Sequence, residues 1–378
     1  NTLSIKYDFA KERKKPSGLL SLWVADMDFP VAQEIKDALI ERCNHGIFGY
    51  SEVKTPYYEV IAKWYQEKFN WTTKKQWLVK TPGVVAAIAN AIRAFTNIGD
   101  AVLIQKPVYY PFFLTIEDNQ RKVVNNSLVY KNGRYEMDFV DFEEKIISHK
   151  VKLFVLCSPH NPVGRVWNKE ELLKIGDICL KHKVIVVADE IHADFVYQGH
   201  QHQVFANLKT DYQEITVTCT APSKTFNIAG LQVSNIFIAN ENLRKKFKQE
   251  LKKTANADIN VMGLIACQAA YSQGEDWLRQ VKIYIAENLE YVKTFLRDNL
   301  PQVKLVEPEG TYLLWLDFRE LNLTEEELED LIINKAKLWL DGGTMFGTEG
   351  VGFQRINIAC PQKNLIQAFT QLKEALKQ

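Results

Sequence analysis

The sequence predicts an α/β protein whose largely parallel sheet is covered by helices on both faces, giving three αβα layers. Two observations carry this prediction. Short apolar runs alternate with amphipathic helical patterns through the middle of the chain, and parallel strands need such helical crossovers. The 378 residues, 46% of them hydrophobic, are also enough to bury one large core and a smaller second one.

Seven of the apolar runs have the length and composition of strands. They lie at residues 76–80, 101–105, 122–127, 151–157, 184–189, 215–220 and 235–239. Helical spacing of apolar residues between the runs is clearest at 84–95 and 169–182. This rhythm of strand, helix and strand is typical of a sheet that is buried on both faces.

The pattern changes after a long helical stretch at residues 241–300. Strand patterns lie at 303–306, 311–317 and 353–359, with an acidic helix at 324–340 and a last helix that begins at Pro361. We therefore expect a large domain at residues 31–280 and a smaller α+β domain formed by residues 1–30 together with 281–378. The sequence has no repeats and no low-complexity linker, so the two domains should pack tightly.

Composition and charge argue against several function classes. The net charge of +1 creates no field that attracts nucleic acid or a membrane, and no apolar stretch is long enough to span a bilayer. The basic stretch at 244–253 follows a helical pattern and indicates a solvated helix face. His200 and His202 have no nearby cysteine or acidic partner, so we expect no metal site. The six cysteines show no CxxC spacing, which indicates reduced, buried thiols and a cytoplasmic protein.

Polar side chains follow three of the predicted strands. Asn161, Asp189 and Lys224 come in this order along the chain, each after an apolar run. Singly, each has a simpler explanation as a turn residue, a helix cap or a solvated lysine. Together they lie at the carboxyl ends of neighbouring strands, where such sheets bind ligands. An amine that can form an imine, a carboxylate for a pyridinium and an amide for a phenolic oxygen match the needs of pyridoxal 5′-phosphate (PLP).

A glycine turn precedes the helix expected at 84–95. Thr81-Pro82-Gly83 opens that helix, and the free N–H groups and the dipole at a helix N-terminus favour a phosphate. A glycine before a helix is commonly only a turn, so this motif is weak by itself. The motif alone therefore favours a phosphate without identifying one.

The chain resembles the fold-type-I PLP enzymes, the aspartate aminotransferase superfamily, over essentially its whole length. Within that superfamily it is most similar to the C–S lyases of the cystathionine β-lyase and cysteine desulfhydrase branch, the cystalysin type. The segments that carry this closer resemblance are residues 23–30, 48–50, 189–194, 223–232 and 353–361. The resemblance implies the three-layer PLP-transferase fold and a homodimer with shared active sites.

The resemblance also implies a role for each site residue. Lys224, Asp189 and Tyr109 are the expected catalytic residues, with Tyr109 stacked on the pyridine ring. The expected cofactor-binding residues are Tyr50 of the neighbouring subunit, Gly83, Val84, Val85, Tyr109, Asn161, Asp189, His192, Ser223 and Lys224. The expected substrate-binding residues are Ala25, Tyr110, Asn161 and Arg355, with Arg355 gripping the substrate carboxylate.

Two positions depart from the superfamily pattern. The hydroxyl residue usual three positions before the lysine is Ala221, which leaves Thr220 or Ser223 to take its place. The arginine usual eight positions after the lysine is Gln232. We therefore expect the helix N-terminus at Gly83 to balance more of the phosphate charge.

The activity that the resemblance implies is elimination of a thiol from an L-amino acid with sulfur on Cβ. L-Cystathionine and L-cysteine are the expected substrates, and pyruvate, ammonia and a thiol are the products. An aminotransferase would use the same PLP residues and is the first alternative. A protein that keeps the PLP fold and regulates a partner by binding it is the second, although intact Lys224, Asp189 and Arg355 favour catalysis.

Overall fold

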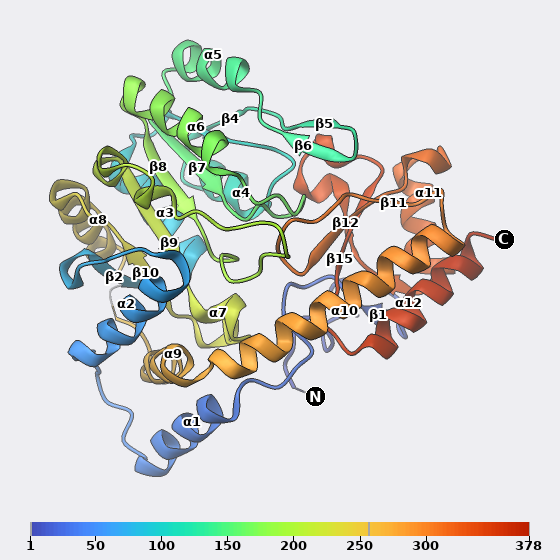
Figure 1. The fold of residues 1–378 in the computed structure, drawn as a ribbon, viewed down its shortest axis with the longest axis horizontal. Helices are drawn as coiled ribbons and strands as arrows, with labels where there is room; N and C mark the ends of the chain where they lie inside the picture. Colours follow the sequence, from blue (N-terminus) through green and yellow to red (C-terminus); the bar gives the residue numbers. More distant parts are fainter. Residues whose placement is uncertain (1, 256–257, 378) are drawn as a thin grey trace.

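The computed structural model describes residues 2–255 and 258–377. Its centre is a seven-stranded sheet with the strand order β2-β10-β9-β8-β7-β3-β4 (Figure 1). All seven expected strands are present, as β2 (Leu78–Thr81), β3 (Ala101–Ile104), β4 (Lys122–Asn125), β7 (Leu153–Cys157), β8 (Ile185–Asp189), β9 (Thr216–Thr220) and β10 (Ser234–Phe237). Strands β4, β3, β7, β8 and β9 run parallel, and β10 is antiparallel to both of its neighbours. The predicted, largely parallel sheet is confirmed.

Helices cover both faces of this sheet (Figure 1). They include α3 (Val84–Phe95), α4 (Pro111–Asp118), α5 (Phe139–His149), α6 (Lys169–His182) and α8 (Glu241–Lys253). In β7, Phe154 and Leu156 belong to the core that contains residues of α5 and α6. Leu153 and Val155 belong to the core that contains residues of α3, α4 and α8. This alternation is the period of two of a strand buried on both faces, and it confirms the three layers.

A second, four-stranded sheet lies in the C-terminal part, with the antiparallel order β11-β12-β15-β14. Its strands are β11 (Lys304–Leu305), β12 (Leu313–Asp317), β14 (Asp341–Gly342) and β15 (Phe353–Asn357). The last helix, α12 (Gln362–Ala375), follows Pro361 as expected. The N-terminal strand β1 (Leu20–Ser21) pairs with β13 (Leu338–Trp339), so both ends of the chain contribute to this region.

The acidic helix is shorter than the expected span of 324–340. It begins as predicted, with a capping box between Thr324 and Glu327, but α11 (Glu325–Asp330) is followed by a π-helical turn. Lys337 then has a positive φ of 55°, and the chain continues as β13. The apolar residues of β13 are buried against β1 from the other end of the chain, a contact that local periodicity cannot reveal.

The remaining elements complete the two parts. They are α1 (Gln33–His45), α2 (Thr55–Phe69), the unexpected hairpin β5 (Val129–Lys131) and β6 (Arg134–Glu136), α7 (Pro222–Thr225), α9 (Val261–Gln273) and α10 (Glu275–Asn299). Helix α10 passes through residue 280, where the sequence suggested a boundary. The division of the chain into two domains remains a prediction.

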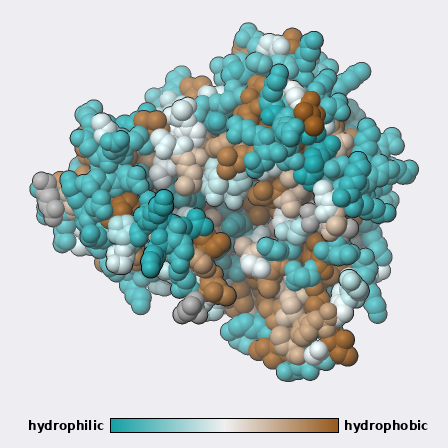
Figure 2. Space-filling view, turned by 180° about the vertical axis from the view of Figure 1, so that it is seen from behind, coloured by the Kyte–Doolittle hydropathy of each residue, from teal (hydrophilic) through white to brown (hydrophobic). Residues whose placement is uncertain are grey.

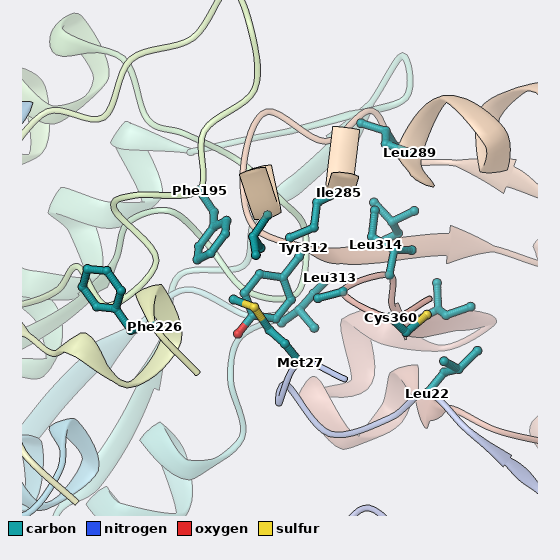
Figure 3. Packing of buried hydrophobic residues seen from close by; sticks show 14 of the residues in the cluster. Leu22, Met27, Phe195, Phe226, Ile285, Leu289, Tyr312, Leu313, Leu314 and Cys360 are labelled. Carbon is teal, nitrogen blue, oxygen red and sulfur yellow. The ribbon is translucent and has the colours of Figure 1, made fainter. Parts of the chain in front are cut away.

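One hydrophobic cluster joins the N-terminal segment to both parts of the molecule. Figure 3 shows Met27 beside the ring of Tyr312, near Leu313 of β12 and Ile285 of α10. Phe226, from the segment after α7, belongs to the same cluster. The N-terminal residues are therefore packed between the large sheet and the smaller one.

Three expectations from composition concern the described residues. None of their helices combines the length and hydrophobicity that crossing a membrane requires. Within the same ranges, no group of three or more His, Cys, Asp and Glu side chains is placed to hold a metal ion. All six cysteines are free thiols, and five are buried, but Cys43 on α1 is exposed. The expectation of buried thiols was therefore wrong for Cys43, which lies on the exposed side of α1 one turn after Leu39 and Ile40.

Candidate active site

Three parallel strands end side by side at the site. Cys157, Asp189 and Cys219 are register partners near the ends of β7, β8 and β9. Asn161 follows β7, and Lys224 follows β9 within the short helix α7. The sheet therefore brings the three residues predicted from strand ends to one edge, as expected of an α/β sheet.

Asp189 is a buried carboxyl group with 5% of its surface exposed. Its Oδ1 accepts a hydrogen bond of 3.1 Å from the backbone N–H of Ile191, and Oδ2 has no hydrogen-bond partner among the described residues. Burial raises the pKa of Asp189 to about 7. A buried carboxylate is stable only with a paired charge, so this environment suits a cationic ring nitrogen opposite Oδ2.

Lys224 presents its amine to the same space. Its Nζ donates a hydrogen bond of 3.0 Å to the carbonyl oxygen of Ala25 and lies 3.9 Å from Oδ1 of Asp26. Burial lowers the pKa of Lys224, which nearby Asp26 and Asp189 partly oppose. A lysine with a lowered pKa is suited both to forming an imine and to acting as a base.

Arg355 comes from β15 of the second sheet and is 3% exposed. Its Nη1 donates 3.0 Å to Oδ1 of Asn161, and its Nη2 donates 2.9 Å to the carbonyl oxygen of Trp23. The same Nη2 is paired with the carboxylate of Asp341, while the buried Nε has no partner among the described residues. The guanidinium thus links the two sheets and retains a free donor for a further anion.

Sequence reasoning missed two residues at this end of the site. Asp341 on β14 forms the buried ion pair with Arg355, and burial raises the pKa of its carboxyl group. The hydroxyl of Tyr312 donates 2.9 Å to the carbonyl oxygen of Ala25, the oxygen that also accepts from Lys224. Neither residue stands in a pattern that distinguishes it from core residues. Asp341 meets Arg355 only through the pairing of two short strands, β14 and β15, and Tyr312 contacts a segment 287 residues away.

The segment 23–29 has no regular secondary structure but is held through its backbone. Asn357 donates to the carbonyl oxygens of Val24 and Asp26, at 2.7 and 2.8 Å. Asn227 accepts from the N–H of Met27 and donates to its carbonyl oxygen, both at 3.0 Å. With the bonds of Arg355 and Lys224, these contacts fix the expected substrate residue Ala25 between β15 and α7. We call residues 23–29 the clamp segment.

The turn at Gly83 opens α3 at the same edge of the large sheet. Gly83 has a φ of 135° and open space where a Cβ would lie, and it is the N-cap residue of the helix. The first N–H groups of a helix lack intrahelical partners. Val84 is buried and Val85 is exposed, so backbone groups rather than these side chains are suited to a phosphate.

Ala221 lacks the hydroxyl that the superfamily has at its position, and of the two proposed replacements, Thr220 and Ser223, the structure favours Ser223. Thr220 is fully buried, and its Oγ1 donates 2.6 Å to the carbonyl oxygen of Asn235, so it was the wrong candidate. Ser223 is half-buried on α7, and its hydroxyl has no partner among the described residues. Gln232, in the position of the missing arginine, is exposed with a φ of 49°.

Tyr109 and Tyr110 lie where α4 begins. The N–H of Tyr109 donates 3.0 Å to the carbonyl oxygen of Asn161, which places this tyrosine next to the β7 end of the site. Burial is the main cause that raises the pKa of Tyr109, so its phenol stays neutral. Tyr110 precedes α4 as its N-cap residue and is half-buried, with its ring centroid 5.5 Å from that of Tyr109.

His192 is buried three residues after Asp189. Its Nδ1 has no hydrogen-bond partner among the described residues, and its ring centroid lies 5.7 Å from that of Tyr312. Burial lowers the pKa of His192 to about 3, so the imidazole is neutral. An unpaired, buried polar atom at this place offers a hydrogen bond to a polar substituent of a bound cofactor.

Tyr50 is separate from the other predicted residues in this chain. It is fully exposed, in a stretch without regular structure between α1 and α2. The role of Tyr50 in the site of a neighbouring subunit remains a prediction.

The residues present fit PLP. Asp189 offers a buried carboxylate, His192 a buried unpaired nitrogen and Lys224 an amine of lowered pKa. Gly83 supplies the backbone of a helix N-terminus with room beside it. These groups match, in turn, a cationic ring nitrogen, a polar ring substituent, an aldehyde and a phosphate.

Comparison with known proteins extends the match over the whole chain. Cystathionine beta-lyase PatB of Bacillus subtilis (strain 168) is 43% identical over 375 residues, covering 99% of this chain and 97% of that protein. Protein MalY of Escherichia coli (strain K12) is 33% identical and covers 100% of this chain and 96% of its own.

Solved structures agree. Cystalysin from Treponema denticola, which contains PLP, superimposes with a TM-score of 0.96 at 38% identity, covering 100% of this chain and 96% of that one. The PLP-bound C–S lyase from Staphylococcus hominis has a TM-score of 0.93 at 33% identity, with the same coverage. These likenesses confirm the PLP-transferase fold. The family model for aminotransferase class I and II matches residues 17–372, and the chain therefore belongs to that family.

Proposed function

We propose that this protein is a PLP-dependent carbon–sulfur β-lyase that acts on L-cystathionine, L-cysteine or related S-substituted cysteines. The observation that carries the proposal is the joining of Lys224 to Arg355 through the clamp segment, where Ala25 binds one and Trp23 the other. The full-length likeness to a cystathionine β-lyase at 43% identity supports the choice of reaction.

The residues divide the work of holding cofactor and substrate. Lys224, Asp189, His192 and the Gly83 turn are placed to hold PLP, with Tyr109 and Ser223 beside them. When bound, PLP takes up the substrate amine and accepts the electron pair that remains at Cα after deprotonation. Arg355, with a free Nε and a neighbour in Asn161, is placed to hold the substrate carboxylate.

Lys224 carries the proton through the reaction. Its neutral amine takes the proton from Cα, for which its lowered pKa prepares it. The Cβ–S bond then breaks, and its electron pair leaves with sulfur. The ammonium of Lys224 returns its proton to the thiolate, and water converts the three-carbon remainder to pyruvate and ammonia.

A side-by-side substrate assay tests the proposal. Pyruvate release is measured from L-cystathionine, L-cysteine and L-methionine with the purified, PLP-loaded protein. We expect pyruvate from the first two and none from methionine, whose sulfur lies on Cγ. Keto acid from methionine only in the presence of an amino acceptor would favour the aminotransferase, which uses the same residues.

The active unit that we propose is a homodimer. Ile47, Phe48 and Tyr50 are exposed although hydrophobic or aromatic, as is Ile40 on α1. Figure 2 views the molecule from behind and shows hydrophobic residues gathered at its lower right, toward the end of the molecule that carries α1 in Figure 1. An exposed apolar group of this kind is typical of a protein interface.

Hybrid dimers test whether Tyr50 completes the partner's site. Tyr50→Phe dimers and Lys224→Ala dimers are mixed, and subunit exchange is verified by a mass tag on one variant. If Tyr50 serves the other chain, the hybrid contains one site with both native residues and activity partly returns. No recovery after verified exchange would place Tyr50 in its own chain's site.

We propose the cytoplasm as the location of this protein. All six cysteines are free thiols, five of them buried, and thiols stay reduced in that compartment. Fractionation of cells that express the native chain, with an antibody to it, tests this location.

A further inference from the structure

One carboxylate near Lys224, that of Asp26, lies outside the set of side chains proposed above to hold the cofactor and the substrate. Asp26 follows Ala25 in the clamp segment, and its Oδ1 lies 3.9 Å from Nζ of Lys224. The Asp26 side chain is 44% exposed, whereas that of Lys224 is 19% exposed. Asp26 is therefore the more solvent-exposed partner of this pair.

The backbone of Asp26 is fixed independently of its side chain. Its carbonyl oxygen accepts 2.8 Å from Nδ2 of Asn357 and 3.3 Å from Nζ of Lys6. The next residue, Met27, is bonded through both N–H and carbonyl to Asn227. Because these bonds hold the segment, the Asp26 carboxylate can be changed without releasing the chain around it.

Charged and titratable groups surround Lys224 from several elements. Asp26 approaches from the clamp segment, Asp189 from β8 and Arg355 from β15. Tyr312 shares the Ala25 carbonyl oxygen with Lys224. The neutral imidazole of His192 lies close enough for its pKa to be influenced by the lysine charge. With PLP bound, Asp189 is expected to face the ring nitrogen, which leaves Asp26 as the carboxylate free to pair with the amine.

We propose that Asp26 is a positioning residue for Lys224. The Asp26 carboxylate stabilises the ammonium of Lys224 that forms when its amine takes the Cα proton. The inference rests on the proposed function. The proton moves from Cα to Nζ, the ammonium is held beside Asp26, and the same proton then passes to the departing sulfur. Asp26 itself neither gains nor loses a proton.

The size of the effect follows from distance and exposure. A carboxylate at this separation raises the pKa of an amine, and partial exposure screens the interaction. We expect Asp26→Asn to lower the pKa of Lys224 by about half to one unit. Because the ammonium is less stable, kcat for elimination should fall about three- to tenfold, while KM changes little.

The pKa of Lys224 is measured in the full-length chain freed of PLP. The rate of acetylation of the Lys224 amine is followed against pH by peptide mass spectrometry in wild type, Asp26→Asn and Asp26→Glu. We expect a lower pKa in Asp26→Asn and a nearly native value in Asp26→Glu, which restores the charge. An unchanged pKa in Asp26→Asn would overturn the proposal.

Asp28→Asn is the matched control. Asp28 lies on the same segment, but its carboxylate binds Lys6 at 2.8 Å and the Tyr7 hydroxyl at 2.7 Å, and not Lys224. We expect no shift in the pKa of Lys224 in this variant. Equal shifts in Asp26→Asn and Asp28→Asn would mean that movement of the segment, not the Asp26 charge, changes Lys224, and would also overturn the proposal.

The PLP-loaded protein gives the second readout. If Asp26→Asn lowered the pKa of Lys224 in the acetylation measurement but left kcat unchanged, Asp26 would have no part in proton transfer, and its proposed role in the reaction would be overturned. Failure of the proposed function is distinct, because wild type itself would then release no pyruvate while the acetylation measurement still reported on the pair.

Discussion

The strand-end half of the site and the clamp half are built differently. Asn161, Asp189 and Lys224 follow neighbouring strands of one sheet, and their places are set by backbone register. The clamp segment and Arg355 meet across more than 300 residues of chain, through side chains that bind backbone oxygens. The first half offers the groups that any PLP reaction needs, and the second determines where the substrate carboxylate lies.

This difference explains how one fold can support several reactions. Loss of a strand-end residue should remove PLP chemistry, whatever the substrate. Loss of a clamp-side residue should instead change substrate affinity or the fate of the proton, with PLP still bound. The predictions below test that separation, from the largest expected effect to the smallest.

Lys224→Ala should abolish activity. The variant lacks both the amine that bonds the cofactor and the group that takes the Cα proton, and proton transfer alone typically contributes 10²–10⁴-fold. We expect pyruvate release to fall by at least about 10³-fold, with loss of the native cofactor absorbance. Lys245→Ala, which removes an exposed lysine of α8, is the control. A borohydride-fixed cofactor in Lys224→Ala at wild-type yield would contradict the assignment.

Asp189→Asn should retain PLP but lose most of the elimination rate. The amide cannot balance a cationic ring nitrogen, so the electron pair at Cα is less well stabilised. Removing one such electrostatic contact typically costs 10²–10³-fold in kcat. Cofactor content and kcat are measured on the same preparation. A nearly native kcat would show that another group balances the ring charge.

Arg355→Leu should raise KM for every substrate by a similar factor and leave PLP bound. A charge-assisted contact with the common carboxylate predicts an increase of roughly 30- to 1000-fold. Arg319→Leu is the control, because the half-exposed Arg319 pairs with Asp317 at the end of β12 and has no contact with Arg355 or Asn161 among the described residues. If cystathionine were impaired and cysteine were not, Arg355 would lie on the leaving-group side.

The smallest effect concerns stability without PLP. Burial raises the pKa of Asp189 to about 7 in the folded chain, above its value when unfolded. The protonated form is therefore favoured by folding, and stability falls as pH rises from about 4 through 7. Between pH 5 and 8 we expect a loss of about 1–3 kcal/mol in wild type that Asp189→Asn lacks. Urea unfolding of the PLP-free proteins measures the difference. If the free energy of unfolding changed with pH in the same way in wild type and in Asp189→Asn, the raised pKa of Asp189 would be refuted.

The large sheet could be predicted because its information is local. Each of the seven strands is an apolar run, and α3 and α6 have the predicted bounds of 84–95 and 169–182. The residues after strand ends then follow from topology. By contrast, β13 and the early end of α11 depend on pairing with β1 near the other end of the chain, which local pattern cannot show.

The same limit applies to the site: residues that follow strands could be predicted, and residues that act through tertiary contacts could not. Asn161, Asp189 and Lys224 could be placed from strand ends, and Arg355 from the resemblance of its strand. Tyr312 and Asp26 could not be assigned contacts, because each contacts a residue distant in sequence. Asp341 could not be paired with Arg355, because their contact depends on the register of the two-residue strand β14 with β15. Thr220 was weighed beside Ser223 because both carry a hydroxyl, and only the direction of the Thr220 side chain, toward Asn235, separates them.

The stoichiometry of products from L-cystathionine tests the central claim most directly. The purified, PLP-loaded protein is supplied with L-cystathionine and no keto-acid acceptor, and pyruvate, ammonia and free thiol are measured together over many turnovers. We predict equal amounts of all three, in large excess over enzyme. A reaction that stops after one turnover, yields no thiol and resumes when a keto acid is added would show transamination and contradict the account.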